Sequence, residues 1–299
     1  DFERFSHRLR QFFADPVLKR WVVGNLCRGK LPQLGQQRQL PPYLRTLPVA
    51  QTIDLQPQFK DLSTDPPDWA AVLPVAGFGY NVEPTELESV FDRSFPDLEQ
   101  YLALHRFSWV PLIDDPAWTQ ALWSIWLRRF GLSPDASWVW HPYTAAERAI
   151  NILAFSRRHG LPTPREETLN CLSLHGEQIA ARLEYFGDAD TSNHLFNNGR
   201  GLLILGVELG KGGLAALGAK IAVEESKRLL LPSGILREGS SHYHILLTNR
   251  VVEVANYCEA AGLAEAAAMH EYAHRATRVA QQLLLPGGLP LIGDVSPDM

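Results

Sequence analysis

The chain has 299 residues, 45% of them hydrophobic, and 28 Lys and Arg residues stand against 33 Asp and Glu residues, for a formal net charge of -5. This composition is typical of a globular protein and excludes a disordered, collagen-like or coiled-coil chain. The acidic balance gives no basic surface for nucleic acid, and no apolar run approaches the ~18 to 20 residues needed to cross a bilayer. We therefore expect neither a nucleic-acid partner nor a membrane anchor.

Residues 1–90 are predicted to form a helix followed by an irregular, Pro-rich arm. Phe2, Phe5, Leu9 and Phe12 lie at helical spacing, which predicts a helix within residues 1–29. Eight prolines between residues 29 and 78 exclude long helices there. We expect this stretch to be extended or to form short strands.

The sequence that follows is dominated by amphipathic helical patterns. Eight segments carry apolar residues at positions i, i+3, i+4 and i+7: 97–108, 115–130, 143–158, 165–186, 193–209, 213–230, 240–261 and 263–285. Short Gly- and Pro-containing breaks separate them, so consecutive helices should pack as antiparallel hairpins. We predict an all-α body over 91–285 and an exit segment over 286–299. A bundle, a solenoid and a closed ring remain open, although the absence of a fixed-period repeat disfavours the solenoid.

A polar cluster marks the predicted helix start near residue 193. Asn193, Asn197 and Arg200 follow one another at i, i+4 and i+7 and share a face, and His194 adjoins them. Neutral donors close to a helix N-terminus favour an anion. The structural alternative is that Ser192 or Asn193 caps the helix and the rest of the stripe is solvated.

A second cluster, Arg237-Glu-Gly-Ser-Ser-His-Tyr-His244, begins the predicted helix 240–261. Ser240 or Ser241 is the expected N-cap. His242 and His244 lie about 200° apart on a helix, so both cannot point into one site with Tyr243. A hydrogen-bonded structural cluster is the alternative. If the fold brings the two helix starts to one rim, their side chains form a single site.

Asn, His and Tyr side chains together suit the abstraction of a proton α to a carboxylate. Amide and imidazole donors can stabilise the carboxylate as it gains enediolate character. A Tyr can serve as general base or acid when its pKa is lowered. Loss of a β-substituent then completes an elimination, which needs neither a metal nor a cofactor.

A competing signal is His270-Glu-Tyr-Ala-His274, since HExxH on a helix places two His on one face for zinc. A zinc site needs a third protein ligand, and no His or Glu follows His274. An exposed amphipathic helix is therefore favoured over a zinc hydrolase, and we expect no metal.

Tryptophan and cysteine are read mainly as core residues. Six of the eight tryptophans fall between Trp109 and Trp140, and we expect most of them to be buried. Trp138 and Trp140, with Tyr143, precede a helix and are the best candidates to line a cleft. The three cysteines are far apart and follow no CxxC pattern, which predicts small buried residues.

The two helix-start motifs resemble those of the heparinase II/III family of bacterial polysaccharide lyases. Ser192-Asn-His-Leu-Phe-Asn197 is similar to the family's Asn-His-Leu-Leu-Glu-Asn helix start, and Glu238-Gly-Ser-Ser-His-Tyr-His244 to its Glu-x-Ser-x-x-Tyr-His segment. Three further segments have counterparts in the expected order: Leu104-His-Arg-Phe-Ser-Trp109, His141-Pro-Tyr143 with Arg148 and Asn151, and Gly288-Leu-Pro-Leu-Ile-Gly-Asp294. The resemblance covers residues 90–299.

This resemblance implies an incomplete (α/α) toroid of helix hairpins, followed by a β-sandwich domain, and eliminative cleavage of a uronic-acid polysaccharide. The polymer would be glycosaminoglycan-like, alginate-like or a bacterial exopolysaccharide. The motif positions imply that Asn193 neutralises the substrate carboxylate, that Tyr243 is the acid or base, and that His194 contacts the carboxylate or assists proton transfer. The other expected substrate contacts are Arg148, His244, Asn197, Glu238, Trp140 and Tyr143.

Two departures from the family pattern matter. Asn197 stands where several relatives carry Glu, so a role for that carboxylate does not transfer. The chain also stops where the family's β-sandwich would begin, a domain that usually supplies a further catalytic His. The expected partners are an acidic polysaccharide and that β-sandwich, and the expected location is periplasmic or secreted, although the chain shows no signal peptide. The alternative is a non-catalytic carbohydrate-binding or assembly protein on the same scaffold.

Overall fold

The computed structural model describes residues 12–13, 16–27, 40–44, 59–188 and 191–295. Within the range predicted as helical, 1–29, residues 12–13 are helical and α2 covers Pro16–Cys27. The other residues of that range lie outside the described residues. Cys171 and Cys258 are buried as expected, but Cys27 at the end of α2 is exposed, so the prediction that all three cysteines are buried is wrong. A short 3-10 turn, η2 (Pro42–Leu44), follows in the arm.

A β-hairpin lies next, in the Pro-rich region where short strands were predicted. Strands β1 (Ala71–Val75) and β2 (Phe78–Val82) pair antiparallel, with Val75 opposite Phe78. Ala76 and Gly77 join them with φ values of 46° and 72°, the left-handed geometry of a tight hairpin turn. Alternate side chains of both strands are buried, which fixes the register because a shift by one residue would expose them. The 3-10 helix η3 (Pro84–Asp92) follows.

Helices make up most of the remaining described chain. They are α3 (Leu98–Arg106), α4 (Val110–Ile113), α5 (Pro116–Phe130), the 3-10 turn η4 (Trp138–Trp140), α6 (Pro142–His159), α7 (Arg165–Ala181), α8 (His194–Glu208), α9 (Gly212–Leu229), α10 (Ser241–Ala260) and α11 (Ala266–Leu283). Each predicted segment contains a helix. The predicted 97–108 segment is shorter because Phe107, at φ 55°, ends α3 in the left-handed region. No helix in the described ranges is long and apolar enough to cross a membrane.

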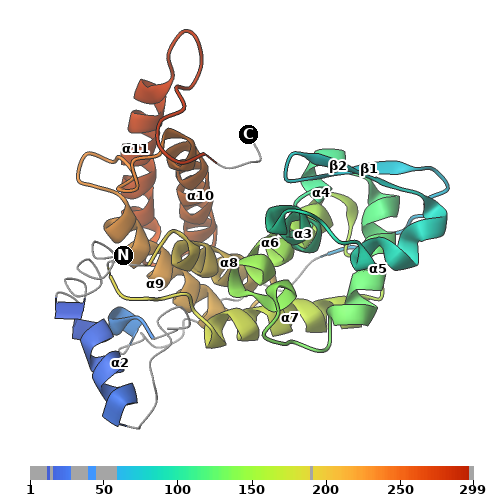
Figure 1. The fold of residues 1–299 in the computed structure, drawn as a ribbon, viewed down its shortest axis with the longest axis horizontal. Helices are drawn as coiled ribbons and strands as arrows, with labels where there is room; N and C mark the ends of the chain where they lie inside the picture. Colours follow the sequence, from blue (N-terminus) through green and yellow to red (C-terminus); the bar gives the residue numbers. More distant parts are fainter. Residues whose placement is uncertain (1–11, 14–15, 28–39, 45–58, 189–190, 296–299) are drawn as a thin grey trace.

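Consecutive helices pack as antiparallel hairpins arranged along a curve, from α5 at one end to α10 and α11 at the other (Figure 1). In the α8/α9 hairpin, Gly206 lies against Ala215 at one end and Gly199 against Ile221 at the other. Residue numbers that rise on one helix while they fall on the other show the antiparallel direction. In the α10/α11 hairpin, the side chain of His244 contacts Ala276, and that of His270 contacts Glu259.

The core consists of two buried apolar clusters that meet at α8. The larger cluster joins the β-hairpin, α3, α5, α6 and α7 to one face of α8, and the smaller joins the other face of α8 to α9, α10 and α11. Four tryptophans that were predicted to be buried have relative exposures of 0%: Trp109, Trp118, Trp123 and Trp126. Trp140, which was predicted to line a cleft, is also buried, at 1%. Since α8 contributes to both clusters, the position of its N-terminal end is fixed from two sides.

Candidate functional site

A cavity of about 770 Å³ lies where α3, α6 and the N-terminal parts of α8 and α10 meet. Five of the predicted site residues line it: Tyr143, Asn193, His194, Glu238 and Tyr243. The two polar helix starts, which are about 50 residues apart in the sequence, therefore share one wall. Helix N-termini carry partial positive charge and free N–H groups, so this wall favours an anionic group.

The start of α8 leaves the Asn193 side chain free for the cavity. Asn193 occupies the N-cap position, but its side chain makes no capping hydrogen bond. Ser192 supplies the local bond instead, because its hydroxyl accepts from the backbone N–H of His194 at 3.3 Å. This separates the two capping candidates: Ser192 makes the local bond, and the side chain of Asn193 does not cap the helix.

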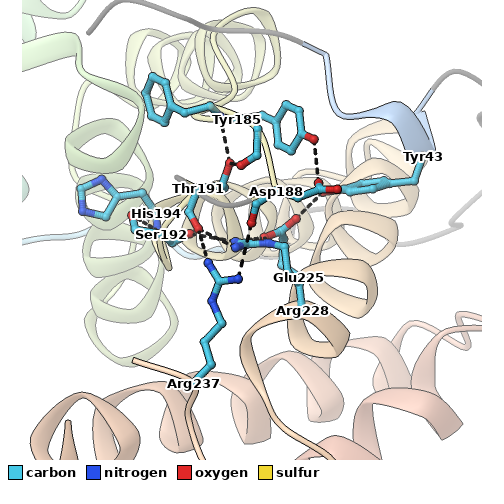
Figure 2. Close-up of polar contacts among 11 residues, drawn as sticks. Tyr43, Tyr185, Asp188, Thr191, Ser192, His194, Glu225, Arg228 and Arg237 are labelled. Carbon is cyan, nitrogen blue, oxygen red and sulfur yellow. Dashed lines mark hydrogen bonds and ion pairs between the residues drawn. The ribbon is translucent and has the colours of Figure 1, made fainter. Parts of the chain in front are cut away.

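Two arginines hold the backbone that leads into α8 (Figure 2). Arg228 donates to the carbonyl oxygens of Thr191 and Ser192, and Arg237 donates to that of Thr191 at 3.0 Å. Arg228 is itself paired with the buried carboxylate of Glu225, which also accepts a 2.8 Å bond from the hydroxyl of Tyr43 in the N-terminal arm. Charge-assisted bonds to consecutive carbonyls restrain the segment just before Asn193.

The start of α10 is capped by Ser240, one of the two serines predicted for this position. Its hydroxyl accepts from the backbone N–H of Tyr243 at 3.0 Å, and it donates to the backbone carbonyl of Asp294 in the exit segment. Ser241 also donates to that segment, at the carbonyl of Pro290. These bonds place Asp294 at the edge of the cavity. The exit segment is therefore part of the wall beside Tyr243.

The surroundings of Tyr243 keep its phenol protonated. Partial burial raises its pKa, and the nearby Asp294, Tyr143 and Glu99 raise it further. The sequence argument required a lowered pKa for a Tyr base, and the structure shows the opposite direction. A phenol in this environment is suited to donate a proton rather than to accept one at neutral pH.

Tyr143 on α6 lines the cavity beside His194. The centroid of its ring is 4.6 Å from that of His194, and the guanidinium carbons of Arg106 and Arg250 lie 4.8 and 5.7 Å from the Tyr143 centroid. Arg250 also forms an ion pair with Glu147 at 3.0 Å. Tyr143 thus combines an apolar face with two neighbouring cations in the cavity lining.

Glu147 carries the negative charge that compensates the neighbouring arginines. Burial alone would raise its pKa, but Arg250, Arg200 and Arg106 hold it below the usual value, so the carboxylate stays charged. Arg106 has a second carboxylate partner, Glu99, at 2.9 Å. The guanidinium groups are consequently fixed in place before any ligand arrives.

The His194 ring is hydrogen-bonded to a buried carboxylate, that of Glu184. Its Nδ1 lies 3.0 Å from Oε1 of Glu184, and Nε2 of His141 lies 3.4 Å from the same oxygen. The other oxygen, Oε2, accepts from the amide of Asn198 at 2.9 Å. Burial raises the pKa of Glu184, but His194, His141 and Asn198 outweigh it and lower the pKa below its usual value. The Glu184 side chain is only 2% exposed.

Four predicted substrate contacts lie outside this cavity. Trp140 is buried against Trp126 and His175, and its exposed neighbour Trp138 stacks on His141. Asn197 is fully buried and accepts from Arg200 at 3.3 Å.

The remaining two are His244 and Arg148. His244 accepts from the backbone N–H of Leu236, and its Nε2 lies 3.1 Å from the carbonyl oxygen of Ala276. The expected separation of His242 and His244 is confirmed, because His242 lines the cavity while His244 is buried in the α10/α11 hairpin.

Arg148 belongs to the core rather than to the cleft. It is fully buried between Trp126, whose centroid is 3.9 Å from the guanidinium carbon, and Trp140 at 5.3 Å. It donates to Nε2 of His175 and to the carbonyl oxygens of His105 and Val139. Burial lowers its pKa to about 9. The side chain links α3, η4, α6 and α7.

An Arg148→Met substitution is expected to destabilise the protein by about 2–4 kcal/mol, because two carbonyl groups and a His nitrogen lose their donor in the core. Urea unfolding followed by circular dichroism measures the change. The matched control is Arg158→Met on the same helix, where the exposed ion pair with Asp114 is lost and the expected change is below about 1 kcal/mol. Equal losses in the two variants would contradict a core role for Arg148.

The HExxH segment does not assemble a metal site in the described part of the chain. His270 and His274 lie on α11, and Nε2 of His270 pairs with Glu259 at 3.0 Å. Among the described residues, no three His, Cys, Asp or Glu side chains are grouped so that they could hold a metal ion. Nothing in this region supports the zinc-hydrolase hypothesis.

Sequence reasoning missed Glu184, Arg106 and Arg250 as neighbours of the site. Arg106 lies inside a segment that carried the family resemblance, so a signal existed for it. Glu184 and Arg250 had none: one lies ten residues before His194 and the other seven residues after Tyr243. Only tertiary packing brings Arg106 and Arg250 into the cavity lining and places Glu184 beside His194.

No protein-family profile matches the chain, and no curated protein matches its sequence. Among solved structures, the chain is similar to heparinase III, with a TM-score of 0.52, 18% identity and coverage of 66% of this chain and 33% of that one. A heparan sulfate lyase, HepC from Pedobacter heparinus, matches with a TM-score of 0.48, 17% identity and coverage of 64% and 33%. A further heparinase III structure with methylated lysines matches with a TM-score of 0.47 and 15% identity, covering 67% of this chain and 36% of that one.

The similarity to heparinase III is one of fold. It confirms the predicted helical architecture, an incomplete (α/α) toroid, over about two thirds of the chain. The chain spans about a third of the length of these solved structures.

Proposed function

We propose that this chain forms the substrate cleft of a polysaccharide lyase that cleaves a uronic-acid-containing polymer by β-elimination. The observation that carries the proposal is the single cavity in which the starts of α8 and α10 place Asn193, His194 and Tyr243 together. The solved structure that shares this toroid is named heparinase III, which supports a polysaccharide as the substrate. The low identity leaves the chemistry to be argued from the cavity itself.

In this proposal the uronate carboxylate lies at the start of α8. The Asn193 amide, which has no capping bond, donates to the carboxylate, and the positive end of the helix stabilises the charge that develops as the C5 proton leaves. Tyr143 offers a face against which a sugar ring packs. Glu238 and Asp294, which are exposed and line the cavity, accept hydrogen bonds from sugar hydroxyls.

The elimination moves two protons. A base takes the proton from C5, the C5–H electron pair forms the C4–C5 double bond, and the C4–O4 bond breaks with its pair on O4. Tyr243 is assigned as the acid that protonates O4, because its raised pKa keeps the hydroxyl protonated. His194 is assigned to accept the C5 proton. The proton on His194 returns to the tyrosinate through water at the end of the cycle.

The first experiment is a screen for elimination. The 299-residue chain, and in parallel the longest polypeptide that contains it, is incubated with glycosaminoglycans, alginate and bacterial exopolysaccharides. The expected result is new ultraviolet absorbance from unsaturated uronate ends with one class of polymer. That result would identify the polymer class as well as the chemistry.

Calorimetric binding on the same panel separates the two function classes. Binding without new absorbance, in the longer polypeptide as well, would reject the lyase and support a carbohydrate-binding protein on this scaffold. A polymer substrate of this kind also places the protein in the periplasm or outside the cell, which is part of the proposal.

A further inference from the structure

We propose that Glu184 is a positioning residue: its buried carboxylate fixes His194 as the Nδ1–H tautomer and leaves the unprotonated Nε2 of that ring directed to the cavity. The proposal assigns a function to a residue at the start of the segment between α7 and α8, outside both helix-start motifs. Its structural part is independent of any activity. Its catalytic consequence, that His194 can accept a proton from substrate, rests on the proposed function.

The first step is the geometry at His194. Nδ1 of its ring is 3.0 Å from Oε1 of Glu184, a normal hydrogen-bond distance. A carboxylate only accepts hydrogen bonds, so the proton between the two atoms belongs to Nδ1. A neutral imidazole has one N–H, and Nε2 is then an acceptor. Within the described residues, no protein group is bonded to this Nε2, and His194 lines the cavity.

The second step shows that Glu184 remains a carboxylate. Its side chain is only 2% exposed, and a buried charge is tolerated only when hydrogen bonds satisfy it. Asn198 donates to Oε2 at 2.9 Å, while His194 and His141 lie beside Oε1. These donors hold the pKa of Glu184 below its usual value despite burial. The group therefore acts as a permanent acceptor at neutral pH.

The third step concerns Asn198, whose amide is fixed in one orientation beside Glu184. The backbone N–H of Glu184 donates to Oδ1 of Asn198 at 3.0 Å. The Asn198 amide is thereby oriented with its oxygen toward the backbone and its nitrogen toward the Glu184 carboxylate. The Asn198 NH₂ group thus donates to Oε2 from a fixed position. It would donate equally to another acceptor atom placed at that position.

A Glu184→Gln variant tests the proposal, because the fixed Asn198 amide determines how the new Gln amide is oriented. The amide introduced by the substitution has one acceptor oxygen and one donor NH₂ group, and the fixed donor of Asn198 draws the oxygen to itself. The NH₂ group then faces His194, where Glu184 had an acceptor. His194 must accept through Nδ1, so its proton moves to Nε2, and the lone pair directed to the cavity is lost.

The tautomer is measured directly, by ¹⁵N NMR of the histidine rings in the full chain at a pH where the ring is neutral. The His194→Gln variant identifies the His194 signals. The expected result is protonated Nδ1 in the wild type and protonated Nε2 in Glu184→Gln. The matched control is Glu208→Gln on α8, which makes the same change at another buried carboxylate, paired with Arg157 and Tyr257, and should leave the His194 signals unchanged.

Wild-type spectra with protonated Nε2 would overturn the proposal, even if Glu184→Gln did not fold. An unchanged tautomer in a folded Glu184→Gln variant would overturn it as well.

The kinetic readout applies once a polymer substrate is found. In Glu184→Gln, kcat for elimination should fall roughly 10²- to 10⁴-fold with KM nearly unchanged, because a base is lost rather than a substrate contact. The expected tautomer shift with no elimination by the wild type on any polymer would reject the proposed function and leave the role of Glu184 intact.

Discussion

A Tyr243→Phe substitution is expected to reduce the rate of elimination by roughly 10²- to 10⁴-fold, because it removes the proposed proton donor to the leaving oxygen. Within the described residues, the Tyr243 hydroxyl makes no hydrogen bond, and the side chain is half-buried. Deleting the hydroxyl should therefore change the free energy of unfolding by less than about 0.5 kcal/mol. Ultraviolet detection of unsaturated ends gives the rate, and urea unfolding gives the stability.

The control for this variant is Tyr257→Phe on the same helix. The Tyr257 hydroxyl donates to Glu208 at 2.8 Å, so its loss should cost about 1 kcal/mol of stability. Elimination should proceed at the wild-type rate. A Tyr243→Phe variant that retains full activity would remove Tyr243 from the proposed acid role and leave His242 as the other titratable group on this part of α10 that lines the cavity.

A large loss of stability is expected from Gly218→Ala in α9. A methyl group at Gly218 would lie 2.2 Å from the backbone nitrogen of Leu203 and 2.5 Å from the carbonyl oxygen of Gly199. Backbone atoms in a helix cannot move aside singly, so α8 and α9 must separate and expose part of the smaller core cluster. We expect a loss of at least about 3 kcal/mol, the upper part of the range for overpacked sites, even though Ala forms helix more readily than Gly.

Gly213→Ala is the matched control for Gly218→Ala. It lies in the first turn of the same helix, and no atom within 4 Å would meet its added methyl group. There the substitution should stabilise the protein by about 0.4–1 kcal/mol, chiefly by reducing the freedom of the unfolded chain. Thermal and urea unfolding compare the two variants. A Gly218→Ala protein as stable as wild type would show that the close approach of α8 and α9 is not required.

The α8/α9 contact also bears on the site. Because α8 carries Asn193 and His194 at its N-terminal end, a displaced α8 would disturb the cavity wall that these residues form. Glycine packing in the core and the geometry of the cavity are thus linked through one helix.

Helix positions could be predicted from the sequence because they depend on local periodicity. Apolar residues repeat at helical spacing, and Gly and Pro interrupt the pattern where the chain turns. The N-cap of the helix 241–260 could likewise be narrowed to Ser240 or Ser241, and the structure selects Ser240. The two polar helix starts and the family resemblance also came from contiguous residues, which is why Asn193, His194 and Tyr243 could be named before their positions were known.

Which polar side chains reach the cavity was decided only by tertiary packing. Arg148 and Trp140 adjoin matched segments, yet their side chains turn into the core, where each finds hydrogen-bond partners and neighbouring aromatic rings. Glu184, in the segment between α7 and α8, is hydrogen-bonded to His194 only in the folded chain, and Asn198 on α8 fixes its carboxylate. The sequence determines where helices begin and which residues stand at their starts, whereas contacts between residues far apart in the chain determine burial, hydrogen bonding and protonation.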